Sequence, residues 1–235
     1  MSLKNWDNKT WLSSNSYIKS FNKFLIKEIK LNKNSEILDI GCGRGKILGN
    51  LTSKLRLIKK PIGIDIEQHK DRDKRIIFNK TDAINYLKKN RKKFDLILLK
   101  QTIHFLPLKD IKKLLLLCIN SLNSGGRIAI FTLATSKNEI PTFVKMKKKL
   151  NKSLKRDQKI LRFINGLYPG GFSKIFSFKV KISRQKYVEM IENRYISTLL
   201  NLSNAEIIQG ISEINRDYRK RLNFKDKLIC LLLKK

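Results

Sequence analysis

The chain has 235 residues, of which 41% are apolar and 30% are charged, and its formal net charge at pH 7 is +33. This length and apolar content are typical of one globular domain with a sizeable core, which excludes a disordered or fibrous chain. The longest apolar runs, residues 114–119 and 228–233, are far shorter than the roughly 20 residues that cross a bilayer, and residues 1–7 lack the apolar core of a signal peptide, so we expect a cytoplasmic protein without a membrane span.

The N-terminal segment predicts a helix and carries several aromatic residues. Polar residues at 13–16 can cap a helix over residues 17–31, whose apolar residues recur at helical spacing. Trp6, Trp11 and Tyr17 lie at or just before its start. These rings either pack in the core or wall a ligand pocket, and the sequence leaves both interpretations open.

Residues 36–46 predict a strand, a tight glycine loop and the start of a helix. Glycine follows the strand at Gly41, Gly43 and Gly45, and apolar residues then recur at helical spacing through Leu55. Glycine allows positive φ and lets a ligand approach the backbone without an intervening Cβ. The free N–H groups at the helix start favour a carboxylate or phosphate.

Strand and helix patterns alternate as far as residue 133, which indicates a parallel sheet covered by helices on both faces. Ligands of such sheets bind at the carboxyl ends of the strands, where the strand order reverses. Asp39, Asp65, Asp82 and the loop at residues 100–104 would converge there. The expected strands lie at residues 36–40, 61–65, 75–79, 94–99 and 127–133, and the expected helices at 45–56, 83–90 and 108–122.

From residue 134 onward the sequence predicts a helical region and two further strands. No internal repeat or linker composition divides the chain, so we expect one domain with an inserted lid. A basic helical stretch breaks at residues 168–171, a strand is expected at 174–182, helices near 183–193 and 203–220, and a last strand at 227–233.

The positive charge has two explanations. Lysine and arginine outnumber aspartate and glutamate by 52 to 19, which ordinarily indicates a nucleic acid or an anionic surface as partner. The lysines are nevertheless spread along nearly every expected helix, and the chain is also rich in asparagine and isoleucine. All three residue types have A/T-rich codons, so mutational bias is the competing explanation. Weak, salt-sensitive, non-specific binding to polyanions follows from either.

In their order and spacing these motifs resemble the class I S-adenosylmethionine (SAM) dependent methyltransferases, most clearly over residues 35–133. The glycine loop reads Asp-x-Gly-x-Gly-x-Gly from Asp39, and the next strand ends on an acid, Asp65. The resemblance implies an α/β fold with a Rossmann-like, doubly wound, seven-stranded and mostly parallel sheet, an antiparallel terminal strand and a helical lid insertion. Within one domain spanning 1–235 it implies an N-terminal lid helix (1–34), a SAM-binding core (35–133), a lid and substrate region with a sheet strand (134–223) and the terminal strand (224–235).

The resemblance also implies which residues bind SAM and its product S-adenosylhomocysteine (SAH). Asp65 would hold the ribose hydroxyls, although a strand-end acid that caps the next loop is the alternative. Ile66 would pack on the adenine, and Asp82 with Ala83 would meet its polar edge. No metal is expected, because the three cysteines show no metal-ligand spacing. The residues expected around the methionine part and the strand ends are Asp39, Gly41, Cys42, Gly43, Gly45 and Lys100.

For the methyl acceptor, the candidates come from three segments. His104, one of only two histidines, follows the fourth expected strand and is either a general base or a structural residue. Tyr17 could pair with it over the methyl group, and Trp11 could wall the substrate pocket. Arg194 and Tyr195 lie in a segment that resembles a lid of the trans-aconitate methyltransferase-like group, in which an arginine binds a substrate carboxylate. An arginine on a solvated helix face is the alternative.

The sequence therefore predicts a SAM-dependent methyltransferase that acts on O or N of a small metabolite, one that carries a carboxylate if Arg194 has the role above. The alternative is a methyltransferase acting on tRNA or rRNA, which the charge favours. Against it, the fourth strand is followed by Lys100, Gln101 and Thr102 rather than the Asn/Asp-Pro-Pro-aromatic stretch of many base amino-group methylases. A SAM-binding protein without catalysis is a third class. The oligomeric state and the acceptor are not predicted.

Overall fold

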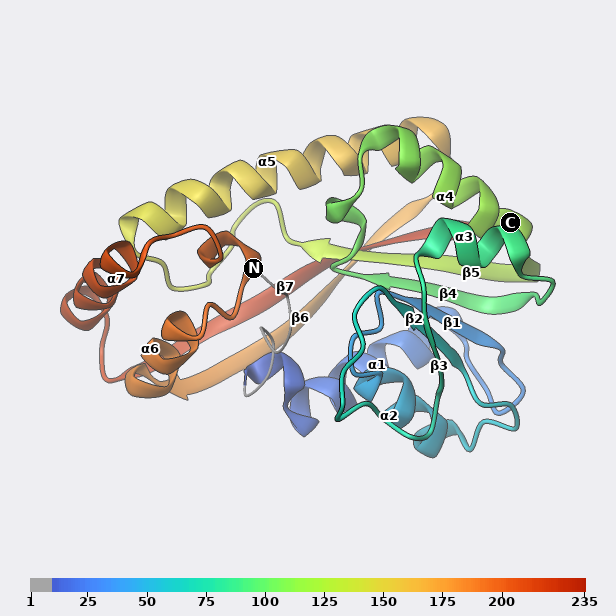
Figure 1. The fold of residues 1–235 in the computed structure, drawn as a ribbon, viewed down its shortest axis with the longest axis horizontal. Helices are drawn as coiled ribbons and strands as arrows, with labels where there is room; N and C mark the ends of the chain where they lie inside the picture. Colours follow the sequence, from blue (N-terminus) through green and yellow to red (C-terminus); the bar gives the residue numbers. More distant parts are fainter. Residues whose placement is uncertain (1–9) are drawn as a thin grey trace.

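Seven strands form one sheet in the order β3-β2-β1-β4-β5-β7-β6 in the computed structural model, which describes residues 10–235 (Figure 1). Trp6, one of the aromatics expected near the pocket, lies outside the described residues. The strands are β1 (Ile37–Ile40), β2 (Ile62–Asp65), β3 (Ile77–Lys80), β4 (Phe94–Lys100), β5 (Leu122–Leu133), β6 (Phe172–Ser183) and β7 (Arg221–Lys234).

Helices connect the strands and cover both faces of the sheet (Figure 1). The α-helices are α1 (Asn15–Ile29), α2 (Lys46–Leu55), α3 (Ala83–Lys89), α4 (Leu108–Asn120), α5 (Val144–Leu167), α6 (Arg184–Glu192) and α7 (Asn204–Asp217). Three short 3-10 helices are η1 (Trp11–Ser13), η2 (Ile103–Phe105) and η3 (Ser197–Leu199). Within the described residues, none of these helices is long and apolar enough to span a membrane.

The direction of β7 confirms the predicted sheet. It runs antiparallel to both of its neighbours, β5 and β6, whereas the strands from β3 to β5 pair in parallel. Leu133 at the end of β5 faces Leu228, and Ser183 at the end of β6 faces Arg221. The strand order reverses at β1, so the carboxyl ends of β1 and β4 form the edge at which ligands of such sheets bind.

Three strands are longer than the sequence pattern predicts. β5 begins at Leu122, because that residue pairs with Phe94 of β4. The pairing shifts register before Leu96, and the glycines of this stretch suggest a turn, so the sequence pattern does not predict the first part of the strand. In β7, buried and exposed residues alternate from Arg221 to Asp226, so the strand starts before its continuously apolar part. β6 is an edge strand, and its alternating lysines face solvent.

Two hydrophobic clusters fill the space on either side of the sheet. One contains the buried faces of α1, α2, α6 and α7, and the other contains those of α3 and α4. Helix α5 contributes to both, with Met146 at its start and Ile160 and Ile164 near its end. Figure 1 shows α5 running along one side of the molecule, above β5 and β7.

Candidate active site

The glycine loop between β1 and α2 is held in a left-handed backbone conformation. Gly41, Gly43 and Gly45 have φ values of 76°, 53° and 68°. The N–H groups of Gly41 and Cys42 both donate to the carbonyl of Ile64, at 2.8 and 3.1 Å. These bonds fasten the loop to the adjacent strand β2 at the edge where the strand order reverses.

The three glycines have different surroundings. A Cβ on Gly41 would lie 2.3 Å from Thr102 Oγ1, and one on Gly45 would lie 2.2 Å from Ile76 Cδ1. A Cβ on Gly43 would meet no atom within 4 Å. Gly41 and Gly45 are therefore needed for internal packing, whereas Gly43 presents bare backbone to an open space.

Asp65 connects the loop to the end of β2. Its Oδ2 accepts a hydrogen bond from the Gly43 N–H at 2.8 Å, and its Oδ1 accepts one from the Glu67 N–H at 3.0 Å. The carboxylate therefore caps its own loop, as the structural alternative expected, and it also lines the cleft beside the glycine loop. Each carboxylate oxygen can accept a further hydrogen bond, so this role leaves room for ribose hydroxyls.

A cleft of about 370 Å³ lies at the carboxyl ends of the strands. It is bordered by the glycine loop, the end of β2, the start of α3 and the segment after β4, with Leu12 and Ile18 from the N-terminal segment. Gly45 does not line it and packs against Ile76. The other residues predicted to bind cofactor all line it: Asp39, Gly41, Cys42, Gly43, Asp65, Ile66, Asp82, Ala83 and Lys100.

Asp39 is a buried acid at the floor of the cleft. It is 3% exposed, and its Oδ1 has no hydrogen-bond partner among the described residues. Burial raises its pKa to about 7, against the opposing effect of Lys100, and Asp65 raises it further. A buried acceptor of this kind fits a ligand that brings a positively charged donor. The amino-acid end of SAM carries such a group, so these residues fit that cofactor.

Lys100 and Asp82 have structural contacts of their own. Lys100 Nζ lies 5.3 Å from the centre of the Tyr17 ring and 5.6 Å from that of Phe21. Asp82 is the N-cap of α3, and its carboxylate accepts from the backbone N–H of Asn85 at 2.9 Å and from its side-chain amide at 2.6 Å. These hydrogen bonds lower the pKa of Asp82, so it stays ionised at the rim of the cleft.

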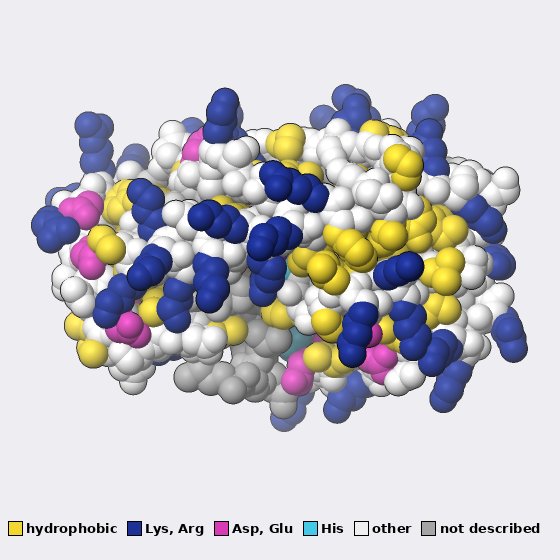
Figure 2. Space-filling model, turned by 90° about the horizontal axis from the view of Figure 1, so that it is seen from above, with side chains coloured by type: hydrophobic (Ala, Val, Ile, Leu, Met, Phe, Trp, Pro, Cys, Tyr) yellow, Lys and Arg dark blue, Asp and Glu magenta, His cyan; other side chains and the backbone are white. Residues whose placement is uncertain are grey.

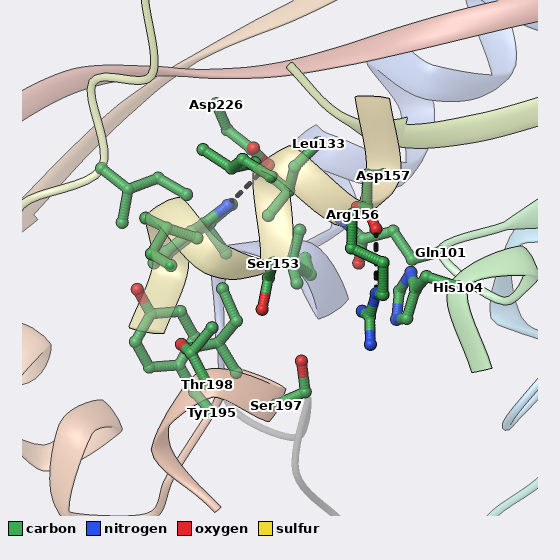
Figure 3. A pocket seen from close by; sticks show the side chains of 16 residues that line it. Gln101, His104, Leu133, Ser153, Arg156, Asp157, Tyr195, Ser197, Thr198 and Asp226 are labelled. Atoms are coloured by element: carbon green, nitrogen blue, oxygen red, sulfur yellow. Dashed lines mark hydrogen bonds and ion pairs between the residues drawn. The ribbon is translucent and has the colours of Figure 1, made fainter. Parts of the chain in front are cut away.

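A second, smaller cavity of about 40 Å³ adjoins the cleft, and Leu12 and Gln101 line both (Figure 3). Its walls come from η1, the segment after β4, the residues from the end of β5 to Ile140, α5, the residues around η3 and β7. The lining is mainly apolar and aromatic, with a few charged groups. We refer to it below as the acceptor cavity.

His104 faces this acceptor cavity and keeps a neutral ring. Burial lowers its pKa to about 4, with a further contribution from the positive charge of Arg156. Its Nδ1 is buried and has no hydrogen-bond partner among the described residues. Figure 3 shows Arg156 beside His104 and joined to Asp157 by an ion pair, which measures 3.7 Å from Nε to Oδ1. At neutral pH the imidazole can therefore accept a proton or a hydrogen bond.

Tyr17 is not part of either cavity. Its side chain is fully buried, it packs edge-to-face on Phe176 and Phe178, and its hydroxyl has no hydrogen-bond partner among the described residues. Burial raises its pKa far above the ordinary value. The structure does not place Tyr17 beside His104, and the proposed pair over the methyl group has no geometric support.

Trp11 and Tyr195 line the acceptor cavity, and Arg194 does not. Trp11 Nε1 donates to Asp226 Oδ2 at 2.9 Å. Arg194 donates to the Leu199 carbonyl at 2.6 Å and to Asn204 Oδ1 at 2.9 Å. It therefore stabilises the turn between α6 and α7, which is neither of the roles that the sequence suggested for it.

Sequence reasoning missed the charged residues Arg156, Asp157 and Asp226 of the acceptor cavity, and it placed Gln101 only as part of the loop at residues 100–104. Gln101 has a φ of 55°, which is unusual for a residue other than glycine. Asp157 lies on the buried stripe of α5, and Asp226 occupies an inward position of β7. An acid at an inward-facing position was the available signal, because such burial is costly without a partner.

The sheet order, the glycine loop and the strand-end acids together define a class I SAM-dependent methyltransferase. A family model described as a methyltransferase domain matches residues 31–194, and the chain belongs to that family. No curated protein matches the sequence.

Solved structures of similar fold come from different proteins. A SAM-dependent methyltransferase from Thiobacillus denitrificans with bound SAH is 15% identical, with a TM-score of 0.58 over 98% of this chain and 97% of that one. A plantazolicin methyltransferase with a pentazolic desmethylPZN analog and SAH is 18% identical, with a TM-score of 0.55 over 98% and 88%. The precorrin 8w decarboxylase of Methanobacterium thermoautotrophicum is 12% identical, with a TM-score of 0.53 over 92% and 89%. Identities this low establish the fold alone.

Proposed function

We propose that this enzyme transfers the methyl group of SAM to O or N of a small molecule whose reacting end enters the acceptor cavity. The observation that carries the proposal is the position and size of that cavity. It shares Leu12 and Gln101 with the cofactor cleft and has a volume of about 40 Å³. An enclosed protein cavity that takes up benzene measures about 150 Å³, so this smaller one suits the reacting end of a small molecule.

Residues of the cleft would bind the cofactor, and residues of the acceptor cavity would bind the methyl acceptor. Asp39 would hold the amino group of the cofactor, and Asp65 would hold the ribose while fixing the Gly43 backbone. Bound SAM supplies a methyl group that its sulfonium already activates, so the protein mainly supplies proximity, orientation and exclusion of water. His104 would accept a proton or a hydrogen bond from the acceptor.

Two narrower expectations gain no support. A substrate carboxylate was expected to meet Arg194, but that side chain is bonded within its own turn. The likeness to the trans-aconitate methyltransferase-like group depended on the same segment and stays a prediction. The plantazolicin methyltransferase of similar fold was crystallised with a pentazolic desmethylPZN analog and SAH rather than with RNA.

RNA is the alternative acceptor, and the observation in its favour is the net charge of +33. Figure 2 shows lysine and arginine side chains over much of the visible face, with few acidic ones. On this face they are spread over the surface rather than confined to one patch. Such a distribution favours weak, non-specific contact with polyanions over a defined RNA site.

The test uses SAM with a labelled methyl group. The protein is incubated with a small-metabolite extract in one reaction and with total RNA from the same cells in another. We expect label in the small-molecule fraction and none in RNA. Sequence-dependent label in RNA would reverse the assignment, and salt-sensitive RNA binding without label would leave the small-molecule proposal intact.

A further inference from the structure

Two carboxylate oxygens in the wall of the acceptor cavity lack a hydrogen-bond donor. Asp226 is 1% exposed, and while its Oδ2 accepts from Trp11, its Oδ1 has no partner among the described residues. Asp157 is 5% exposed, and its Oδ1 has no hydrogen-bond partner within the usual distance there, although it forms an ion pair with Arg156 Nε at 3.7 Å. A carboxylate oxygen is an acceptor, so burial without a donor is unfavourable unless a ligand or a proton supplies one.

The other polar groups of the cavity do not satisfy Asp226. Arg156 is directed to Asp157 and His104, and its side chain is 52% exposed. Asp226 lies at the other end of the cavity from His104 (Figure 3). Burial raises the pKa of Asp226, against the opposing effects of the Trp11 hydrogen bond and of the charge of Lys100. Thr198 is also unpartnered, but a hydroxyl both donates and accepts and does not discriminate between ligands.

The apolar part of the lining limits what can bring the donor. Leu133, Ile140, Leu150 and Leu154 surround the polar groups. A substrate carboxylate at the Asp226 end would place like charges together in a site that excludes water, which is strongly unfavourable. A cationic or neutral N–H group satisfies the free oxygen and offsets the negative charge.

Building on the proposed function, we propose that the methyl acceptor is an amine with an apolar body, and that Asp226 binds its N–H group. Asp157 offers a second acceptor in the same wall. Trp11 orients Asp226 by holding Oδ2, so that Oδ1 is the oxygen left for the ligand. The amine is the group by which the substrate is recognised, whichever of its atoms receives the methyl group.

The experiment separates the labelled product by charge. Unreacted SAM, which is itself a cation, is first removed by chromatography, and the labelled product is then applied to a cation exchanger at about pH 2, where carboxyl groups are neutral and amines are charged. We expect the label to be retained. Label that flows through would show an acceptor without an amine and overturn the inference while leaving the methyltransferase assignment standing. Absence of any labelled small molecule would count against the proposed function itself.

The variant Asp226→Asn tests the residue. It keeps an oxygen for Trp11 and removes the charge, so we expect the KM for the purified acceptor to rise at least tenfold while SAH affinity stays within twofold. Glu192→Gln is the matched control, since it removes an exposed acid at the end of α6. A purely structural Asp226 would instead lower the melting temperature and leave KM unchanged, and that result would refute the assignment. If Asp226→Asn does not fold, the inference is tested by the KM of Asp157→Asn for the acceptor and by the charge of the labelled product.

Discussion

The Trp11 indole donates its N–H to Asp226 across 215 positions of sequence, at 2.9 Å. The Trp11 ring also packs edge-to-face on Tyr195 and Phe224, with centroids 5.1 and 5.3 Å apart. These contacts fix the N-terminal segment over the start of β7 and close one wall of the acceptor cavity.

Trp11→Phe should therefore destabilise the fold. The variant leaves both oxygens of Asp226 without a donor in a buried site, at a cost of about 1–3 kcal/mol. Chemical denaturation of the two proteins measures the difference in free energy of unfolding. Unchanged stability would mean that Asp226 is protonated or hydrated and does not depend on the indole.

Asp65→Ala should weaken SAH binding by about tenfold, which corresponds to about 1.4 kcal/mol. The change removes the ribose-binding group and also the acceptor that holds the Gly43 N–H. Isothermal titration calorimetry measures the affinity, with Asp65→Asn as the control that keeps one acceptor. An affinity equal to that of the unaltered protein would remove Asp65 from the cofactor site.

Gly43→Ala should lose mainly cofactor affinity, whereas Gly41→Ala should lose mainly stability. At Gly43 an added Cβ meets no protein atom, so the chain should fold and lose mainly cofactor affinity, with a backbone strain of about 1–2 kcal/mol. At Gly41 the Cβ would lie 2.3 Å from Thr102 Oγ1, so the melting temperature should fall further. Melting curves with and without SAH distinguish the two. Equal affinity of Gly43→Ala for SAH would show that the open space is not part of the site.

The affinity for SAH should rise with pH up to about 7. The pKa of Asp39 is about 7 because the group is buried, and its charged form is the one that attracts an ammonium group. Below that pH a proton must be released on binding, which costs up to tenfold in affinity per pH unit. In the ligand-free protein the raised pKa favours protonated Asp39. The contribution of this group to the free energy of unfolding is therefore lost as pH rises from about 4 to 7. Calorimetry on Asp39→Asn should show a flat pH profile, and a profile that matches the unaltered protein would contradict this account.

His104 should titrate near pH 4, so that its ring is neutral in the resting protein at neutral pH. Its pKa in the folded protein is below the ordinary 6.5. The neutral ring therefore contributes to the free energy of unfolding, and this contribution, on the order of 3 kcal/mol, is lost as pH falls from about 6.5 to 4. The ring signals in an NMR titration measure this pKa directly. His104→Ala should retain SAH affinity and lose turnover, whereas full activity would make the residue structural.

The local part of this architecture was predictable, because it depends on neighbours in sequence. Gly41, Gly43 and Asp65 belong to a strand, turn and helix whose spacing specifies the cleft. The acceptor cavity depends instead on six segments that only tertiary packing brings together. Asp157 and Asp226 could be placed on buried faces from periodicity, but no local pattern places both in one wall.

The residues of the two cavities become available at different times during synthesis of the chain. All residues that line the cofactor cleft lie between Leu12 and Leu106, whereas the acceptor cavity also needs Asp226. The strand that carries Asp226 comes last in sequence and yet lies between β5 and β6 in the sheet. On the ribosome, a nascent chain can complete the cleft residues first, but it can form the acceptor cavity only after β7 emerges and inserts between two strands already synthesised. The acceptor cavity is therefore completed later in synthesis than the cofactor cleft.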